Sequence, residues 1–285
     1  MRLSRALAVL DRRIDGTPLA LCRVMVGTAA LVRGLASYFV MMRVLSPGGV
    51  RAPGFDWSPP VSLVAAPWLI GIWLIAAFCF LVGFRTRLSG AVLAVTIAYY
   101  LLADGSLYAS HIYFLLLIVF LLTVADSGAA FSVDWYLRGM PRAEVAYGPV
   151  LLLKLQVAIV YFFAGIAKLN PAFLSGEVLP ENLSSFPDAW MTPEVAIAAS
   201  WAAMMLEFYL VFALWIRRLR MSAIFFGLIF HGLIVVTMSF YAGLITYSTT
   251  IVATYWLYLS NEEVAVLRQR IAGFLGSDGE RYETA

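Results

Sequence analysis

The sequence predicts an all-α fold, a polytopic integral membrane helix bundle with about eight transmembrane helices. Hydrophobic residues make up 62% of the 285 residues, whereas charged residues make up only 13%. Soluble domains contain about 45–50% apolar and about 25% charged residues. A single water-surrounded core of this size cannot bury such an excess, so lipid must be the solvent for much of the surface.

Eight apolar segments are long enough, or nearly long enough, to cross a bilayer. In chain order they are 17–40, 61–82, 88–103, 111–126, 149–168, 194–216, 221–238 and 241–259. The third and fourth are short, and we expect them to be tilted or to reach only partway across. The first is not a cleavable signal peptide, because it is too long and contains Arg23 and Arg33.

The chain divides into three regions. Residues 1–16 form a basic amphipathic stretch, which we expect to lie along the cytoplasmic membrane surface. Residues 17–259 are the transmembrane domain, and residues 260–285 are a cytoplasmic tail. The tail is predicted to begin with a short surface helix that Ser260 or Asn261 caps, because acidic residues follow at once and basic residues come later.

Basic residues outside the spans are distributed unevenly between the two sides of the membrane. If the N-terminus is cytoplasmic, 14 arginines lie in the cytoplasm, and the outer side has only Arg43, Arg51 and Lys168. This asymmetry predicts a multi-pass protein with both termini in the cytoplasm. The Pro- and Gly-rich segment 41–60 is then an irregular outer loop, and 127–148 is a cytoplasmic connection with a short helix around VDWYLR.

The composition also excludes several classes of protein and site. The net charge is only +3 and the basic residues are scattered, which argues against nucleic-acid binding. Cys22 and Cys79 both lie within apolar segments, so neither a disulfide framework nor a zinc spacing can be built from them. We therefore expect no metal site.

Charged residues inside the predicted spans are candidates for function, because an unpaired charge in the membrane is costly. Arg23 and Arg33 either snorkel from a long tilted helix or belong to a site, and the sequence leaves this open. Lys154 lies about one turn into its helix and is expected to snorkel to the cytoplasmic surface. Glu207, near the middle of its span, is expected to pair with an Arg or His of a neighbouring helix, in a structural or a catalytic role.

The only two histidines and one lysine suggest a site on the outer side. His111 begins the fourth span, Lys168 ends the fifth, and His231 lies near the centre of the seventh. Apolar residues around Lys168 (Phe162, Phe163, Ile166 and Leu169) would favour the neutral amine that a base needs. A buried histidine by itself is more often a structural, hydrogen-bonded residue than a catalytic one. The hypothesis is that Lys168, His111 and His231 converge on one partly hydrated outer cavity.

One segment carries a recognisable motif. The stretch LKLQVAIVYFFAGIAKLNPAFLSGE, residues 153–177, contains in order Tyr161, Ala164, Gly165, Lys168, Leu169, Phe173 and Gly176. This order resembles the central motif of the HTTM family, the membrane domain shared by vitamin K-dependent gamma-carboxylase and many bacterial proteins. Phe173 stands where tryptophan is more usual. LALCRVMVG, VGFRTRLSG, SHIYFLLLIVF, FSVDW and FHGLIVVTMSFYAG are further similarities in the family's order, so the resemblance covers about 17–259.

The resemblance implies a chemistry for particular residues. In the carboxylases the matching lysine deprotonates a reduced vitamin K, which would make Lys168 the catalytic base. His111 would be the second catalytic residue, matching the histidine that stabilises or positions a glutamyl carbanion. His231 and Tyr161 would contact the cofactor, a vitamin K-type hydroquinone. The chain is expected to be a short bacterial-type member without the carboxylases' lumenal domain, and Ser110 replaces the asparagine that precedes their histidine.

Two hypotheses of different classes therefore remain. The first is a membrane enzyme, of the gamma-carboxylase, lyase or monooxygenase kind, that uses a lipid-soluble quinol at Lys168 and His111. The second is a non-enzymatic membrane protein that exports, matures or sequesters a peptide or small protein. Secondary transport is less favoured, because the sequence has no visible inverted repeat.

Overall fold

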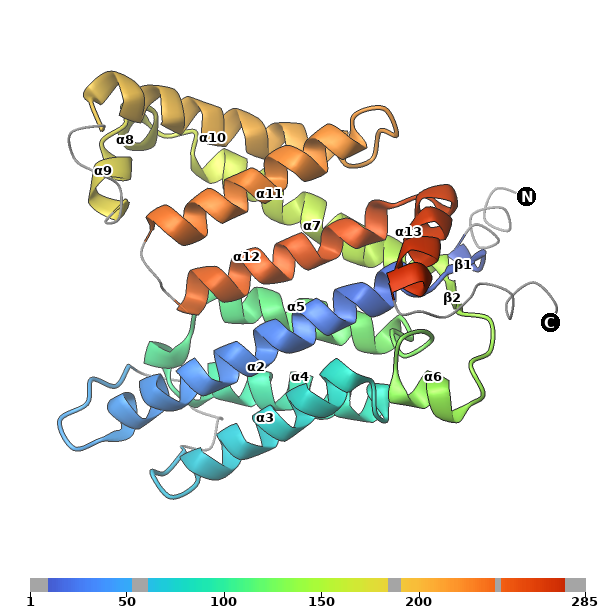
Figure 1. The fold of residues 1–285 in the computed structure, drawn as a ribbon. Coiled ribbons are helices and arrows are strands. Elements are labelled where there is room, and N and C mark those ends of the chain that lie inside the picture. Colours follow the sequence, from blue (N-terminus) through green and yellow to red (C-terminus); the bar gives the residue numbers. More distant parts are fainter. Residues whose placement is uncertain (1–9, 53–60, 184–190, 239–241, 275–285) are drawn as a thin grey trace, which may run out of the picture.

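The computed structural model describes residues 10–52, 61–183, 191–238 and 242–274, and it is a bundle of helices. The helices that run along the bundle lie side by side with alternating directions (Figure 1). They are α2 (Thr17–Leu45), α3 (Ala66–Val82), α4 (Thr86–Ala103), α5 (Ser110–Val124), α7 (Tyr147–Ala167), α10 (Pro193–Ala213), α11 (Arg220–Thr237) and α12 (Ala242–Thr254). The predicted all-α fold is confirmed for the described residues apart from two strands of three residues each.

Shorter elements connect and flank this bundle. They are the strands β1 (Arg13–Asp15) and β2 (Glu144–Ala146), the helices α6 (Val133–Leu137), α8 (Pro171–Leu174), α9 (Val178–Asn182) and α13 (Asn261–Phe274), and the 3₁₀ helices η1 (Gly105–Leu107) and η3 (Tyr255–Tyr258). The helix predicted around VDWYLR is α6, and Ser132 caps it by accepting a hydrogen bond from Trp135 N at 2.9 Å. Residues 53–60 of the predicted outer loop lie outside the described residues.

Not all of the bundle helices are long enough to cross a membrane by themselves. Among the described residues, five helices have the necessary length and hydropathy: α2, α4, α7, α10 and α11. The apolar helices α3 and α5 are shorter, and α12 has 13 residues before it continues into η3. The count of about eight transmembrane helices is therefore not confirmed. The third predicted span was expected to be short, but α4 has 18 residues, whereas α3 covers only part of the second.

The helices differ in how much of their surface the bundle covers. In its apolar window α2 is 56% buried, whereas α11 is only 17% buried. Phe225, Phe226, Leu233 and Val236 of α11 are all exposed large apolar side chains. The high burial of α2 places it at the centre of the bundle. The exposed apolar side chains of α11 are stable in hydrocarbon and not in water, so α11 belongs to the apolar rim of the bundle.

Arg23 joins the centre of the bundle to the connection that follows α5. Its side chain is fully buried, and it donates hydrogen bonds to Ser127 O at 2.8 Å, Ala130 O at 3.4 Å and Phe131 O at 2.5 Å. Gly83 packs on the guanidinium with a positive φ of 70°, and a Cβ there would lie 2.8 Å from Arg23 Nη1. Arg23 does not snorkel; it satisfies backbone carbonyls that no helix or strand would otherwise pair.

Asp134 lies in the same connection between α5 and α7 that Arg23 contacts. Its carboxylate accepts hydrogen bonds from Arg85 N at 2.8 Å, Thr86 N at 2.7 Å and Thr86 Oγ1 at 2.8 Å, so it caps the start of α4. Burial by itself would raise the pKa of Asp134, but these hydrogen bonds and the nearby Arg138 hold that pKa below its usual value. The segments VGFRTRLSG, FSVDW and LALCRVMVG thus meet at one end of the bundle.

The described part of the N-terminal stretch pairs with a distant segment. Arg13, Ile14 and Asp15 of β1 form an antiparallel ladder with Ala146, Val145 and Glu144 of β2. The prediction for residues 1–16 took no account of this strand, because three residues of local pattern do not reveal a partner far along the chain. Residues 1–9 lie outside the described residues.

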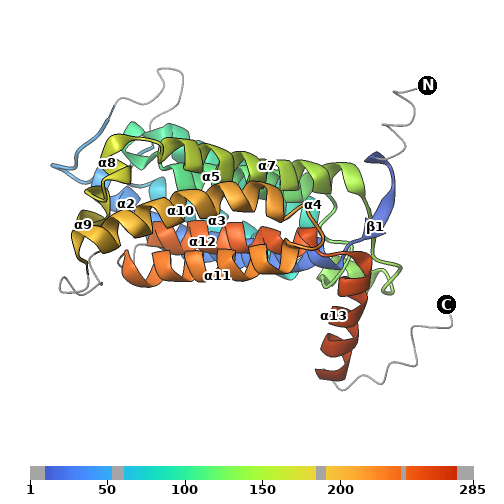
Figure 2. The same cartoon turned by 90° about the horizontal axis from the view of Figure 1, so that it is seen from above.

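The predicted surface helix of the tail is present as α13, which projects from the bundle (Figure 2). Ser260 Oγ accepts from Glu263 N at 3.4 Å, and Glu263 Oε2 accepts from Ser260 N at 2.6 Å. This reciprocal arrangement is a capping box. Of the two caps that the sequence left open, the contacts favour Ser260.

Candidate functional site

Lys168 and Glu207 form an ion pair between α7 and α10. Lys168 directly follows α7, and its Nζ donates to Glu207 Oε1 at 2.8 Å and to Oε2 at 2.9 Å. The Lys168 side chain is 23% exposed and that of Glu207 only 6%. Glu207 was expected to pair with an Arg or His, and this expectation is wrong in the identity of the partner.

The sequence of α7 explains why the two helices meet there. Tyr161, Gly165 and Lys168 recur at positions i, i+4 and i+7, so they share one face of the helix. Gly165 lies against the Phe208 ring, and a Cβ at this position would be only 3.0 Å from Phe208 Cζ. A glycine therefore allows α10 to approach closely enough for Glu207 to reach the lysine.

The apolar residues expected to surround Lys168 have a different role. Phe162, Phe163, Ile166 and Leu169 are between 40% and 60% exposed, and they belong to the outer surface of the bundle. A helix presents these positions in other directions than that of Lys168, and their effect on the neutral amine stays a prediction. The closest group of opposite charge, the Glu207 carboxylate, was missed.

The later part of the motif places an aromatic ring over the ammonium. Asn170 caps α8 by accepting a hydrogen bond from Phe173 N at 2.9 Å. The Phe173 ring centroid then lies 5.6 Å from Lys168 Nζ, within the range of a cation–π interaction. Gly176, with a φ of 81°, packs against α10, where a Cβ would lie 2.7 Å from Ile197 N. Phe173 thus contributes an aromatic face to the lysine.

A second group of polar side chains lies between α7, α11, α12 and η3. Tyr161 Oη is hydrogen-bonded to His231 Nε2 at 2.8 Å and also to the Tyr255 hydroxyl. His231 Nδ1 is hydrogen-bonded to Ser248 Oγ at 3.3 Å. Tyr161, His231 and Tyr255 are almost completely buried. The two residues predicted to contact a cofactor therefore contact each other, with both nitrogens of His231 satisfied by the protein.

His111 has a partner in the central helix. Arg33 Nη1 lies 3.1 Å from His111 Nε2, and Arg33 Nε donates to Ser37 Oγ at 3.1 Å. A guanidinium can only donate, so Nε2 accepts and this contact requires the neutral form of the histidine. Gly243 of α12 packs against the ring, where a Cβ would lie 2.7 Å from Cε1. Arg33 is buried and paired, and it does not snorkel.

These groups are linked through α12. Tyr247 lies one turn after Gly243, and its ring centroid is 6.0 Å from that of His231 and 5.7 Å from that of Phe114. Glu207 is close enough to interact electrostatically with the hydroxyl groups of Tyr161 and Tyr247. One face of α12 thus lies between the two histidines, and Tyr161 connects this face with the Lys168–Glu207 side of α7.

The structure does not place Lys168 and His111 in direct contact. Among the described residues no hydrogen bond joins them, and each has its own partner, Glu207 or Arg33. One pocket in the described part of the chain lies at the end of the bundle near β1, and an apolar one lies between α3 and α4. Neither includes Lys168, His111 or His231, so a shared hydrated cavity stays a prediction.

The described residues contain no cluster of three or more His, Cys, Asp or Glu side chains that could hold a metal ion.

Arg33 was a candidate that the sequence left open, and its contact with His111 could have been foreseen. Both residues lie in the outer half of predicted spans, and a buried cation seeks an acceptor. Nothing in the sequence indicated that Tyr255 belongs to the His231 group.

The family model of the HTTM domain matches residues 11–262, which is most of the chain. The matched region includes the Lys168–Glu207 pair, both histidines and the contacts of Arg23 with the connection that follows α5. No solved structure matches the chain.

Proposed function

Because the chain belongs to the HTTM family of membrane proteins, we propose that it is a quinol-using membrane enzyme in which Lys168 acts as a base. The observation that carries this proposal is the buried Lys168–Glu207 pair, with Nζ at 2.8 and 2.9 Å from the two carboxylate oxygens. A lysine can act as a base only if its ammonium first loses a proton. Glu207 is positioned to accept that proton.

The residues around Lys168 suit a lipid-soluble aromatic reductant. The Lys168 side chain is 23% exposed, and the Phe173 ring lies next to its ammonium. The surrounding surface is apolar, with Phe163 60% exposed and Leu169 53% exposed. A bound hydroquinone would supply an acidic hydroxyl group and reducing electrons. Glu207 would first take a proton from the Lys168 ammonium. The neutral Nζ would then take the proton of the hydroquinone hydroxyl group, and Phe173 would orient the ring.

His111 and the Tyr161–His231 group would act on the same reaction from further away. Arg33 holds His111 neutral with Nε2 as an acceptor, so His111 can offer a proton only from Nδ1. Tyr161 and His231 are hydrogen-bonded to each other and lie on the α12 side of α7. We propose that they position α7, and with it Lys168, while His111 acts on a second substrate.

The membrane and orientation are part of the proposal. Arginines accumulate in the segments 85–87, 138–142 and 217–220, and β1 and α13 lie at this same end of the bundle (Figure 1). The positive-inside rule would make this end cytoplasmic in a bacterial inner membrane. Lys168, at the opposite end of α7, would then work on the outer side.

The test is oxygen uptake by the purified protein with reduced vitamin K. Lys168→Arg keeps the positive charge and the pair with Glu207 but removes the ability to become neutral. We expect it to abolish quinol-dependent oxygen uptake while the protein stays folded and inserted. The matched control is Lys154→Arg, the same substitution at the other end of α7, which should leave the activity unchanged.

Two results would reject the proposal. Wild-type activity in Lys168→Arg would exclude the lysine as the base. No quinol-dependent oxygen uptake by the wild-type protein would favour a non-enzymatic role in the export, maturation or sequestration of a peptide. Glu207→Gln provides a second measure, because loss of the proton acceptor should lower kcat by about 100-fold, in the range of general acid–base effects.

A further inference from the structure

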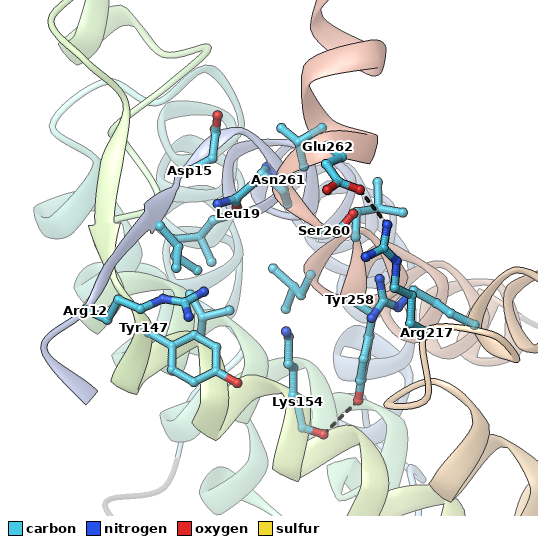
Figure 3. Close-up of a pocket in the computed structure, with 17 residues that line it drawn as sticks. Arg12, Asp15, Leu19, Tyr147, Lys154, Arg217, Tyr258, Ser260, Asn261 and Glu262 are labelled. Atoms are coloured by element: carbon cyan, nitrogen blue, oxygen red, sulfur yellow. Dashed lines mark hydrogen bonds and ion pairs between the residues drawn. The ribbon is translucent and has the colours of Figure 1, made fainter. Parts of the chain in front are cut away.

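A pocket of about 480 Å³ lies at the end of the bundle that carries β1 and α13, far along α7 from Lys168. Figure 3 shows Lys154 pointing into this pocket, with Arg12 and Tyr147 on one side and Arg217 and Tyr258 on the other. The pocket is formed by β1, the beginnings of α2, α7 and α13, and the residues around the start of α11. Neither the HTTM motif nor the proposed reaction uses it.

The charges in this pocket are unbalanced. Four basic side chains line it, and only two acidic ones do; they are Arg12, Lys154, Arg217, Arg220, Asp15 and Glu262. Both acidic groups already have partners, since Asp15 Oδ1 accepts from Thr17 N at 2.8 Å and Glu262 Oε2 accepts from Arg217 at 2.5 Å. Arg220 is likewise paired, with Glu263 at 3.0 Å, so the positive charge that no carboxylate neutralises is that of the other two basic residues.

Lys154 and Arg12 carry this excess. Lys154 Nζ lies 5.5 Å from the Tyr147 ring centroid and 5.3 Å from that of Tyr258, and the Arg12 guanidinium lies 5.9 Å from Tyr147. No ion pair of either residue with a carboxylate is present in the part of the chain that the structure describes. Instead, Arg12 and Arg220 are close enough to repel the Lys154 ammonium. An anion between these cations would replace that repulsion with attraction.

Three helices add their positive ends to the same place. The helix α2 begins at Thr17, α7 at Tyr147 and α13 at Asn261, and residues from the first turn of each line the pocket. The N-terminus of a helix attracts negative charge through its dipole. The backbone therefore supports the same sign of ligand as the side chains.

We propose that this pocket binds a phosphate-bearing anion, which Lys154 and Arg12 contact directly. The remaining walls include Leu19, Val150 and Leu257, so the pocket can also hold an apolar part next to the phosphate. The headgroup of an anionic membrane lipid and a soluble phosphate ester share this chemistry. Tyr258, whose hydroxyl donates to Lys154 O at 2.9 Å, fixes its ring against Lys154 and keeps the ammonium directed into the pocket.

The experiment compares two sources of the anion on the full-length protein. In the first arm, the protein is extracted from nanodiscs of phosphatidylcholine alone or of phosphatidylcholine mixed with phosphatidylglycerol, and native mass spectrometry counts the retained lipids. In the second arm, the delipidated protein is titrated with inorganic phosphate and with glycerol 3-phosphate, and the thermal shift is measured. Each arm uses wild type, Lys154→Gln, Arg12→Gln and Lys154→Arg.

Arg142→Gln is the matched control. Arg142 is exposed, lies just before β2 and does not line the pocket, so its substitution makes the same change in net charge. We expect Lys154→Gln and Arg12→Gln to weaken anion retention by about tenfold, as for the loss of one hydrogen bond to a charged group. Lys154→Arg and Arg142→Gln should retain it. Arg12 lies outside the helices, so Arg12→Gln remains informative if Lys154→Gln fails to fold.

Each outcome decides a part of the proposal. Selective retention of phosphatidylglycerol identifies a lipid headgroup, and thermal shifts with glycerol 3-phosphate alone identify a soluble ester. No preference for either anion in wild type would overturn the proposal. Equal losses in Arg142→Gln and Lys154→Gln would overturn it too, since they would show a response to net charge rather than to the pocket.

Discussion

The two lysines of this protein stand at opposite ends of α7, and their surroundings are opposite as well. Lys168 is paired with a buried carboxylate, that of Glu207. Lys154 is held between the rings of Tyr147 and Tyr258, and the positive charges of Arg220 and Arg12 act on it. Both side chains are partly buried, so burial alone does not distinguish them.

The neighbouring charges decide what each of these partly buried lysines can do. At Lys168 the protein supplies both the proton donor and its acceptor, which suits proton transfer. At Lys154 the protein supplies only cations and aromatic faces, which suits the capture of an anion from outside. A residue expected merely to snorkel therefore stands in the more unusual electrostatic environment of the two.

The largest expected effect is all-or-none and concerns the side of the membrane on which each lysine works. Reporter fusions after residues 55 and 180 should report the outer side, and fusions after residues 140 and 218 should report the cytoplasm. The asymmetry of arginines is the reason. The measurement is a pair of reporters active on opposite sides. A cytoplasmic signal at residue 180 would remove Lys168 from the outer side, and the proposed mechanism with it.

The next largest effect is on stability at the Lys168 end. Glu207→Leu leaves the ammonium without its carboxylate, and we expect it to lower the free energy of unfolding by about 3 kcal/mol, the lower end of the range for a broken buried pair. Chemical unfolding in detergent measures this. The double variant Lys168→Met with Glu207→Leu should recover most of the loss, because no charge is left unpaired. Unchanged stability in the single variant would contradict the pairing.

At the Lys154 end the same kind of change should have little effect on stability. Lys154→Gln removes two cation–π contacts but also relieves repulsion by Arg12 and Arg220. We therefore expect the free energy of unfolding in the absence of anionic lipid to change by less than about 1 kcal/mol. The same unfolding experiment measures it. A loss as large as that of Glu207→Leu would show that Lys154 is primarily a structural residue.

The smallest expected effect is local to α13, which borders the Lys154 pocket. Burial alone would raise the pKa of Glu263, but the hydrogen bond from Ser260 N and the Arg220 guanidinium hold that pKa below its usual value. A carboxylate with a lowered pKa stabilises the folded form above the unfolded value of about 4.3, and the stabilisation is lost as the pH falls through the lower, folded value.

Hydrogen exchange of α13, corrected for the intrinsic rate, should therefore become faster as the pH falls below about 4. Glu263→Gln should remove this pH dependence while the rest of the bundle exchanges as before. If α13 exchanges equally at every pH in the wild-type protein, the contact between Glu263 and Arg220 does not hold the helix.

The sequence by itself determined the helices and the family. Each predicted apolar segment contains a helix of the structure, with ends that differ by a few residues, because hydropathy and helix-ending residues act locally. The capped surface helix after Ser260 and the short helix at 133–137 were predicted for the same reason. The motif around Lys168 indicated the HTTM family, which the family model confirms over residues 11–262.

Only the tertiary structure decided which polar groups meet. Lys168 and Glu207 are 39 positions apart, Tyr161 and His231 are 70 apart, and Arg33 and His111 are 78 apart. Which residues meet depends on the order of the helices in the bundle and on the rotation of each helix about its axis. Helix surfaces that are uniformly apolar in the sequence determine neither the order nor the rotation. Lys154 gives the clearest case: its own helix suggested snorkelling, and only the tertiary structure brings Arg12, just before β1, and Arg220 of α11 into the same pocket.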